Sequence, residues 1–285
     1  MKLHAHALAA CLVFGLASTA VAGNESQASV SEASMLVRGS ILLGPDGKVQ
    51  SYAIDREDKL PASVVELMQK NIAKWSFEFD HPPSAPIRET MSVRVVAYTV
   101  DQQHAKLVVA GATFADGDSD PALHVRPRNI VAPRFPGTSR ADGVSGTVYL
   151  LMRLGRDGHV QEIFAEQVNL RRYLPQARME VYEHDLAKAA IEAIKEWTFD
   201  LPTQGPEANR DSMLVRMPVD FSFHLKGTPT DDNYGKWDTY MPGAHRQAPW
   251  LGDSKLASDA PDSVPEGMLK QLDTGPRLAT SPEAN

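Results

Sequence analysis

The sequence contains almost no cysteine. Its 285 residues include one, Cys11, which lies in an apolar N-terminal stretch. A chain that loses this stretch can form no disulfide and offers no thiolate for catalysis or zinc binding. We therefore expect the protein to be held together by its hydrophobic core alone.

Motifs for metal binding and catalysis are also missing. Seven histidines follow the N-terminal stretch, and none lies within five residues of another, so the spacing typical of zinc ligands is absent. No Gly-x-Ser-x-Gly elbow marks a nucleophile, and no glycine-rich phosphate loop precedes a helix. The sequence predicts no catalytic residue, no cofactor site and no metal site, which favours a non-enzymatic protein over a hydrolase.

Positive charge and long apolar runs are scarce as well. The 29 Lys and Arg against 36 Asp and Glu give a net charge of −7, which argues against nucleic acid or an anionic membrane as partner. The apolar run around Ala7–Ala17 has roughly 16 residues, fewer than the roughly 20 that span a bilayer. With Lys2 before it and Ala20-Val21-Ala22 after it, the run predicts a cleaved signal peptide, residues 1–22.

Two alternatives to a cleaved signal remain: a retained anchor, and a lipoprotein cleavage box at Leu8–Cys11. Cleavage after residue 22 would remove Lys2 and lower the net charge to −8. The exported protein would then contact a membrane only through its partners, or through a signal that stays uncleaved.

The mature chain begins with a polar leader and a first periodic block. Residues 23–34 are small and polar and predict a disordered leader. Residues 35–100 predict a β-hairpin with its turn at Gly44–Gly47, a helix opened by Pro61, and a final strand. Residues 101–130 are expected to be a linker that contains one short strand candidate, Lys106–Ala110.

A second block, residues 131–226, repeats the first. Gly155-Arg-Asp-Gly158 matches Gly44-Pro-Asp-Gly47 at an offset of 111 (158 − 47). Two later anchors match at an offset of 122: Trp197-Thr-Phe199 with Trp75-Ser-Phe77, and Met213-Leu-Val215-Arg216 with Met91-Ser-Val93-Arg94. The difference of 11 residues predicts an insertion around Tyr173–Asp185, which we expect to form a loop.

Each block predicts one amphipathic helix that ends near a tryptophan. Both tryptophans are expected to pack in a core against a sheet. Asp185 is the expected N-cap of the second helix. The apolar stripes are Val64, Leu67, Met68, Ile72 and Trp75 in the first block, and Leu186, Ala190, Ile191, Ile194 and Trp197 in the second.

The second block resembles the C-terminal domain of TonB-type energy transducers. The motifs that carry the resemblance are Pro133-Arg-Phe135-Pro136, Gly146-Thr-Val148, Asp157-Gly158-x-Val160, Ala189-Ala190-x-x-Ala193-Ile194-x-x-Trp197-Thr198-Phe199 and Val219-x-Phe221-x-Phe223. The resemblance implies a periplasmic α+β domain, a small antiparallel sheet with a helix packed on it, that binds an extended segment of an outer-membrane receptor. The first block looks like a degenerate copy without the leading Phe-Pro element. No long proline-rich spacer is present.

The last strand of the second block, Met213–Leu225, is the expected partner-binding element. It contains Pro218, and proline is confined to edges and bulges of sheets because it cannot donate to the ladder. An open edge can accept an added strand from a partner. Whether the Pro218 nitrogen faces that edge, and so limits pairing, is left open. The predicted partner-binding residues are Met213, Leu214, Val215, Arg216 and Met217, with the methionines and Val215 as apolar contacts and Arg216 as a contact for an acidic group.

Residues 227–285 predict a largely disordered tail, in which Trp237, Tyr240 and Trp250 either pack on a domain surface or form a docking motif. The expected fold is α+β, with two tandem TonB C-terminal-like domains. The expected function is a periplasmic protein-interaction module that binds a segment of an envelope or outer-membrane protein by strand addition, with a possible role in TonB-dependent transport. The alternative is an envelope assembly factor whose two domains pair with each other or in a homodimer.

Overall fold

The computed structural model describes residues 32–99, 105–116, 120–223, 233–252, 260–272 and 275–282. The expected signal peptide and most of the expected leader lie outside these residues. The fold is α+β, built from small antiparallel sheets and few helices. In the described part of the chain, no helix has the length and apolar character needed to cross a membrane.

The first unit has one helix and contributes four strands to a five-stranded sheet, whose fifth strand comes from the tail and pairs with β1. β1 pairs with β2 on one side and with β4 on the other, and β4 pairs with β5. β5 uses residues of the expected linker, so the prediction of a linker at 101–130 is wrong for this part. The elements are β1 (Glu32–Leu43), β2 (Val49–Ile54), α1 (Ala62–Ile72), β3 (Phe77–Glu78), β4 (Ile87–Thr99) and β5 (Ala105–Asp116).

The second unit has the same order of hairpin, helix, short strand and long strand. Its sheet runs β12-β10-β7-β8. The short strand β6 lies apart from this sheet and pairs with β9. The elements are β6 (Arg126–Asn129), α2 (Gly137–Ala141), β7 (Gly146–Gly155), β8 (Val160–Leu170), α3 (Gln176–Ile194), β9 (Thr198–Asp200) and β10 (Ser212–Phe221).

The sequence repeat is also a repeat of hydrogen bonds. In the first unit the N–H of Phe77 donates to the carbonyl of Gly47 at 2.9 Å, and in the second the N–H of Phe199 donates to the carbonyl of Gly158 at 2.9 Å. Both glycines have positive φ, 76° and 79°, a conformation that glycine adopts without strain. The turn of each hairpin is therefore tied to the phenylalanine two residues after the tryptophan.

The insertion in the second unit is not the loop that the sequence predicts. It lengthens regular structure: α3 has 19 residues against 11 in α1, and β8 has 11 against 6 in β2. Asp185 therefore lies inside α3, where it accepts a hydrogen bond from Thr138 at 2.8 Å. The N-cap of α3 is Pro175, as Pro61 is that of α1.

Each unit has its own hydrophobic core between sheet and helix. The predicted stripes are confirmed, because the side chains that face the sheet from α1 and α3 are buried and the remaining members pack at the margin of the cores. Trp75 and Trp197 are both buried, as expected. In the first unit Trp75 and Phe77 make edge-on contacts with Phe114 of β5. β5 is thus part of the core that the first block builds.

The prediction of a largely disordered tail is wrong for the described residues after position 232. They form short strands and one of the 3-10 helices: β11 (Asp238–Tyr240), η5 (Pro261–Ser263), β12 (Lys270–Gln271) and β13 (Arg277–Leu278). The described residues before the tail also form the 3-10 helices η1 (Glu57–Lys59), η2 (Pro121–Leu123) and η3 (Pro206–Asn209). Trp250 packs under the guanidinium of Arg153 and Tyr240 is buried, which agrees with surface packing of these aromatics.

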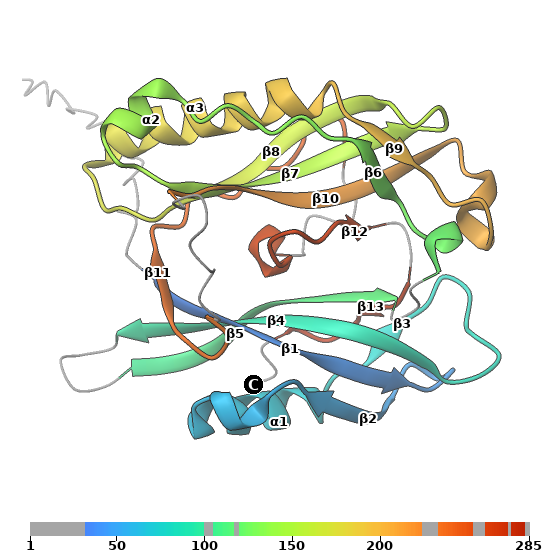
Figure 1. The fold of residues 1–285 in the computed structure, drawn as a ribbon. Coiled ribbons are helices and arrows are strands. Elements are labelled where there is room, and N and C mark those ends of the chain that lie inside the picture. The colour runs from blue at the N-terminus through green and yellow to red at the C-terminus, as the bar shows by residue number, and fades with distance from the viewer. Residues whose placement is uncertain are drawn as a thin grey trace, which may run out of the picture.

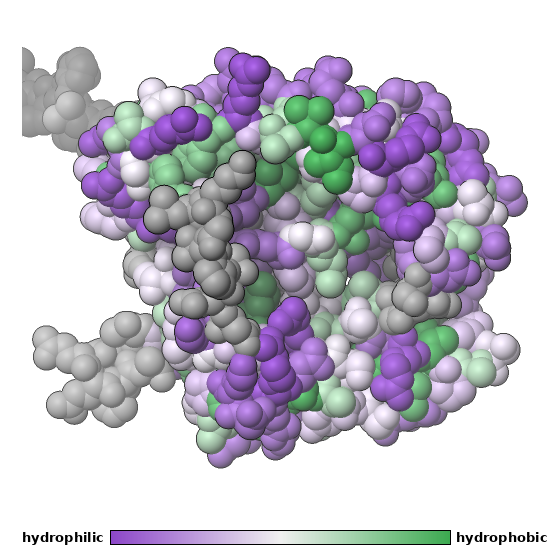
Figure 2. Space-filling model, viewed as in Figure 1, coloured by the Kyte–Doolittle hydropathy of each residue, from purple (hydrophilic) through white to green (hydrophobic). Residues whose placement is uncertain are grey.

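The two sheets lie one above the other, with α1 and α3 on the outer sides, η5 between them and β12 at the edge of the second sheet (Figure 1). η5 joins the sheets through Asp262. This carboxylate accepts hydrogen bonds from Gln167 and Asn169 of β8 and forms an ion pair with Arg94 of β4 at 3.3 Å. Thr113 of β5 contacts Ser263 at 2.6 Å. The face seen in Figure 2 carries hydrophilic and apolar residues intermixed. The tail therefore connects the two units through a polar, buried layer.

Candidate functional site

The predicted partner-binding strand is β10, and its apolar residues are not free to meet a partner. Met213, Val215 and Met217 point toward α3 and are buried in the core of the second unit. Leu214 lies on the opposite face, beside Leu151 and Leu272. The expectation that these side chains contact a partner is wrong, because the alternation of β10 places both of its faces against other parts of the same chain.

Arg216 is also used inside the protein. Its Nε and Nη2 donate to the two carboxylate oxygens of Glu166 at 2.6 and 3.0 Å. The side chains of Arg216 and Glu166 are only 2% and 3% exposed. The predicted acidic group for Arg216 therefore exists, but it belongs to β8 of the same sheet.

The outer edge of β10 is partly covered by the tail. β12 pairs with Val215 and Arg216, and the N–H of Leu272 donates to the carbonyl of Leu214 at 2.9 Å. In the first unit the same position is held by β5, a strand of 12 residues that pairs along nearly the whole of β4. Among the described strands, β12 is the one that lies on this edge, so β10 has no paired neighbour there from Met217 onward.

The direction of Pro218 follows from this pairing. Main-chain groups alternate between the two edges of a strand. Because the Leu214 carbonyl faces β12, the main-chain groups of Arg216, Pro218 and Asp220 face the same edge. The missing N–H of Pro218 therefore lies on the outer edge, where proline limits unwanted pairing. Beyond it, the N–H of Asp220 points to the same edge.

Each unit also holds an extended arm beside its short strand. In the second unit β6 pairs with β9, and the indole N–H of Trp197 donates to the carbonyl of Val131 at 2.9 Å. In the first unit β13 pairs with β3, and the indole N–H of Trp75 donates to the carbonyl of Pro282 at 3.2 Å. The far end of the tail thus supplies the arm that the first block lacks. The two arms share an arginine at their start but no longer sequence motif, so the sequence does not predict that the tail forms this arm.

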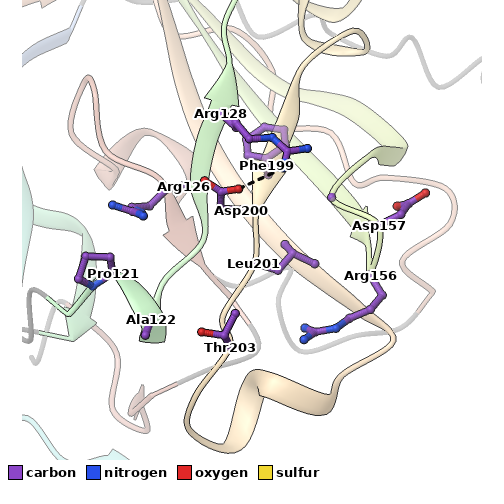
Figure 3. Close-up of a pocket in the computed structure, with 11 residues that line it drawn as sticks. Pro121, Ala122, Arg126, Arg128, Arg156, Asp157, Phe199, Asp200, Leu201 and Thr203 are labelled. Atoms are coloured by element: carbon purple, nitrogen blue, oxygen red, sulfur yellow. Dashed lines mark hydrogen bonds and ion pairs between the residues drawn. The ribbon is translucent and has the colours of Figure 1, made fainter.

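A pocket opens between the arm of the second unit and its hairpin turn (Figure 3). Its volume is about 540 Å³. Arg126 and Arg128 come from β6, Arg156 from the turn, and Leu201 and Thr203 from the segment after β9. Arg128 pairs with Asp200 at 3.4 Å, and Arg156 donates to the carbonyl of Pro202 at 3.3 Å. No sequence motif joins these arginines, because Arg156 is 28 residues away from Arg128 (156 − 128).

The described residues contain no cluster of three or more His, Cys, Asp or Glu side chains that could hold a metal ion. The arrangement offers hydrogen-bond donors, cationic groups and sheet edges, which are groups for binding. Comparison of this chain with family models, with curated proteins and with solved structures found no match.

Proposed function

We propose that this chain is an exported, non-enzymatic protein-interaction module that binds an extended segment of an envelope or outer-membrane protein by strand addition. The two units are, in this proposal, tandem relatives of the C-terminal domain of TonB-type transducers, and the compartment is the periplasm. A role in TonB-dependent transport follows from the same resemblance. The partner strand would lie on the outer edge of β10.

The observation that carries the proposal is the short strand β12. It fills on β10 the position that a 12-residue strand fills on β4, but it pairs with only two residues. Few hydrogen bonds hold β12, and its side chains add a few more, such as Gln271 Oε1, which accepts from the N–H of Val125 at 2.6 Å. A longer strand would make more main-chain bonds on this edge, so it could displace β12.

A second candidate function is an assembly factor of the envelope whose two units pair with each other. The polar layer around Asp262 favours it, because Asp262 links Arg94 of the first unit with Gln167 and Asn169 of the second. In this case β12 would be a fixed part of the structure, and the edge of β10 would never be exposed.

A disulfide between β10 and β12 tests the proposal. Val215 and Gln271 are directly opposite each other, and neighbouring antiparallel strands bring such Cα atoms to about 4.5–5.5 Å, which suits a disulfide. The mature chain without Cys11 has no other cysteine. The variant Val215→Cys/Gln271→Cys is expected to capture an envelope protein when reduced and to lose it when oxidised. The same capture by the oxidised and the reduced protein would contradict strand addition at β10 and favour the assembly function.

A further inference from the structure

The arms of the two units differ in one contact. In the first unit Arg277 forms two hydrogen bonds with the carboxylate of Asp80, at 2.7 and 2.6 Å. The hydrogen bond from Arg277 lowers the pKa of Asp80 below its ordinary value. The offset of 122 places Pro202 in the second unit where the first has Asp80 (202 − 80). The second unit therefore lacks the carboxylate that receives the arm's arginine.

Arg126 is the arginine of the second unit that corresponds to Arg277 and lacks this carboxylate. It begins β6 as Arg277 begins β13, and its partner across the strands is Asp200 as that of Arg277 is Glu78. Asp200, however, pairs through its side chain with Arg128. Within the described residues Arg126 makes no ion pair, and Figure 3 shows its guanidinium pointing away from the Arg128–Asp200 pair. It is exposed at the margin of the pocket.

The pocket has gained a further cation relative to the first unit. Arg156 stands in the hairpin turn where the first unit has Pro45 (156 − 45 = 111). The lining therefore carries three arginines against Asp157 and Asp200, a local charge of +1 on a protein whose net charge is −7. Opposite charges in a partner would be attracted to this pocket although the protein as a whole repels anions.

We propose that the arginine pocket binds a carboxylate on an acidic, extended segment of a partner protein. Arg126 takes this carboxylate as Arg277 takes that of Asp80, since an arginine fork matches the two oxygens of a carboxylate. Arg156 lies across the pocket, in the hairpin turn, and its positive charge adds to the attraction for the carboxylate. The first unit shows this arginine paired with a carboxylate that belongs to a polypeptide, which favours a protein segment over a small molecule. The inference rests on the proposed function for the class of partner, but not on the β10 edge.

Titration calorimetry on the full chain tests the proposal. The probe is a capped hexapeptide of alternating Glu and Thr, the matched peptide has Gln in place of Glu, and succinate serves as a free dicarboxylate. We expect the Glu peptide to bind and the Gln peptide to fail. Arg126→Gln should weaken binding about tenfold, because it removes a charge-assisted pair. Arg140→Gln, an exposed arginine of α2 outside the pocket, should leave binding unchanged.

A second variant keeps the test independent of any effect of Arg126 on folding. Thr203 is exposed in the lining, and Thr203→Glu would bring a carboxylate into the pocket. It should block the peptide at least as strongly as Arg126→Gln does. Equal binding of the Glu and Gln peptides, or binding that neither variant weakens, would overturn the proposal. Succinate that binds as tightly as the Glu peptide would overturn the choice of a protein segment.

The two proposals fail in different experiments. The disulfide between positions 215 and 271 fixes β12, and neither position lines the pocket. Peptide binding that survives oxidation of this variant, and that Arg126→Gln weakens, supports the arginine pocket even where capture at β10 fails. Capture that depends on reduction, with no peptide binding, supports the β10 edge and overturns the pocket.

Discussion

Replacing Gly158 with alanine is expected to lower the free energy of unfolding by at least about 3 kcal/mol. Gly158 has a φ of 79°, and a Cβ there would lie 2.2 Å from the carbonyl oxygen of Phe199. Backbone strain alone costs on the order of 1–3 kcal/mol. The clash adds to it, because the contacting atom belongs to the main chain and the N–H of Phe199 donates to Gly158. Urea denaturation measures the change.

The repeat supplies a second site for this measurement. Gly47 has a φ of 76°, and its Cβ would lie 2.0 Å from the carbonyl oxygen of Phe77, so Gly47→Ala should destabilise the first unit to a similar extent. Gly267 is the matched control, because its φ is also 76° but a Cβ there meets no atom within 4 Å. If Gly158→Ala and Gly267→Ala changed the free energy of unfolding equally, the close contact between the turn and the short strand would contribute nothing to stability.

Replacing Arg216 with methionine is expected to lower the free energy of unfolding by about 3–5 kcal/mol. The substitution leaves the carboxylate of Glu166 buried without its bidentate partner. An unpaired buried charge is far less stable than a buried pair. Thermal or urea unfolding of the single variant measures this effect.

The double variant Arg216→Met/Glu166→Leu should recover most of the lost stability, since an apolar pair of similar volume needs no desolvation of charge. Lys188→Met is the matched control. Lys188 and Glu192 are 3.9 Å apart and more than half exposed, so its removal should change the stability by less than about 1 kcal/mol. A double variant as unstable as the single one would contradict the pairing of Arg216 with Glu166.

The sequence predicts the local structure of both units well, because their signals are local. The Gly-x-Asp-Gly turns, the apolar stripes of the helices and the buried tryptophans all appear where expected. β5 extends well beyond the predicted short strand, Lys106–Ala110. The prediction was too short because a glycine, Gly111, follows Ala110, and glycine is uncommon inside strands. In the structure Gly111 lies at a register shift opposite Arg94, so the strand continues past a bulge.

The tail could not be predicted, because its order depends on contacts far away in the sequence. Its strands have two or three residues, which is too short for an alternating pattern. Its few apolar anchors, such as Val264 and Leu272, lie among Pro, Gly and Asp, a composition that favours disorder. Trp75 binds the carbonyl of Pro282 across 207 residues, and no local signal reports such a contact.

The predicted site residues lie in a strand, as expected, but their side chains are buried within the same chain. The alternation of Met213, Val215 and Met217 marks one face of a strand, but it does not say what covers that face. The structure covers it with α3 and covers the other face with the tail. The strand addition proposed above therefore uses the main-chain edge of β10, and β12 must leave this edge before Val215 and Arg216 can pair with a partner.

Amide hydrogen exchange in the free protein tests this availability most directly. The amides of Leu214 and Arg216 face β12, whereas those of Val215 and Met217 face β7. If a short opening of β12 frees the edge, Leu214 and Arg216 should exchange at least about a hundredfold faster than Val215 and Met217. Equal rates at all four amides would mean that β12 opens only with the whole fold, which would contradict strand addition at β10.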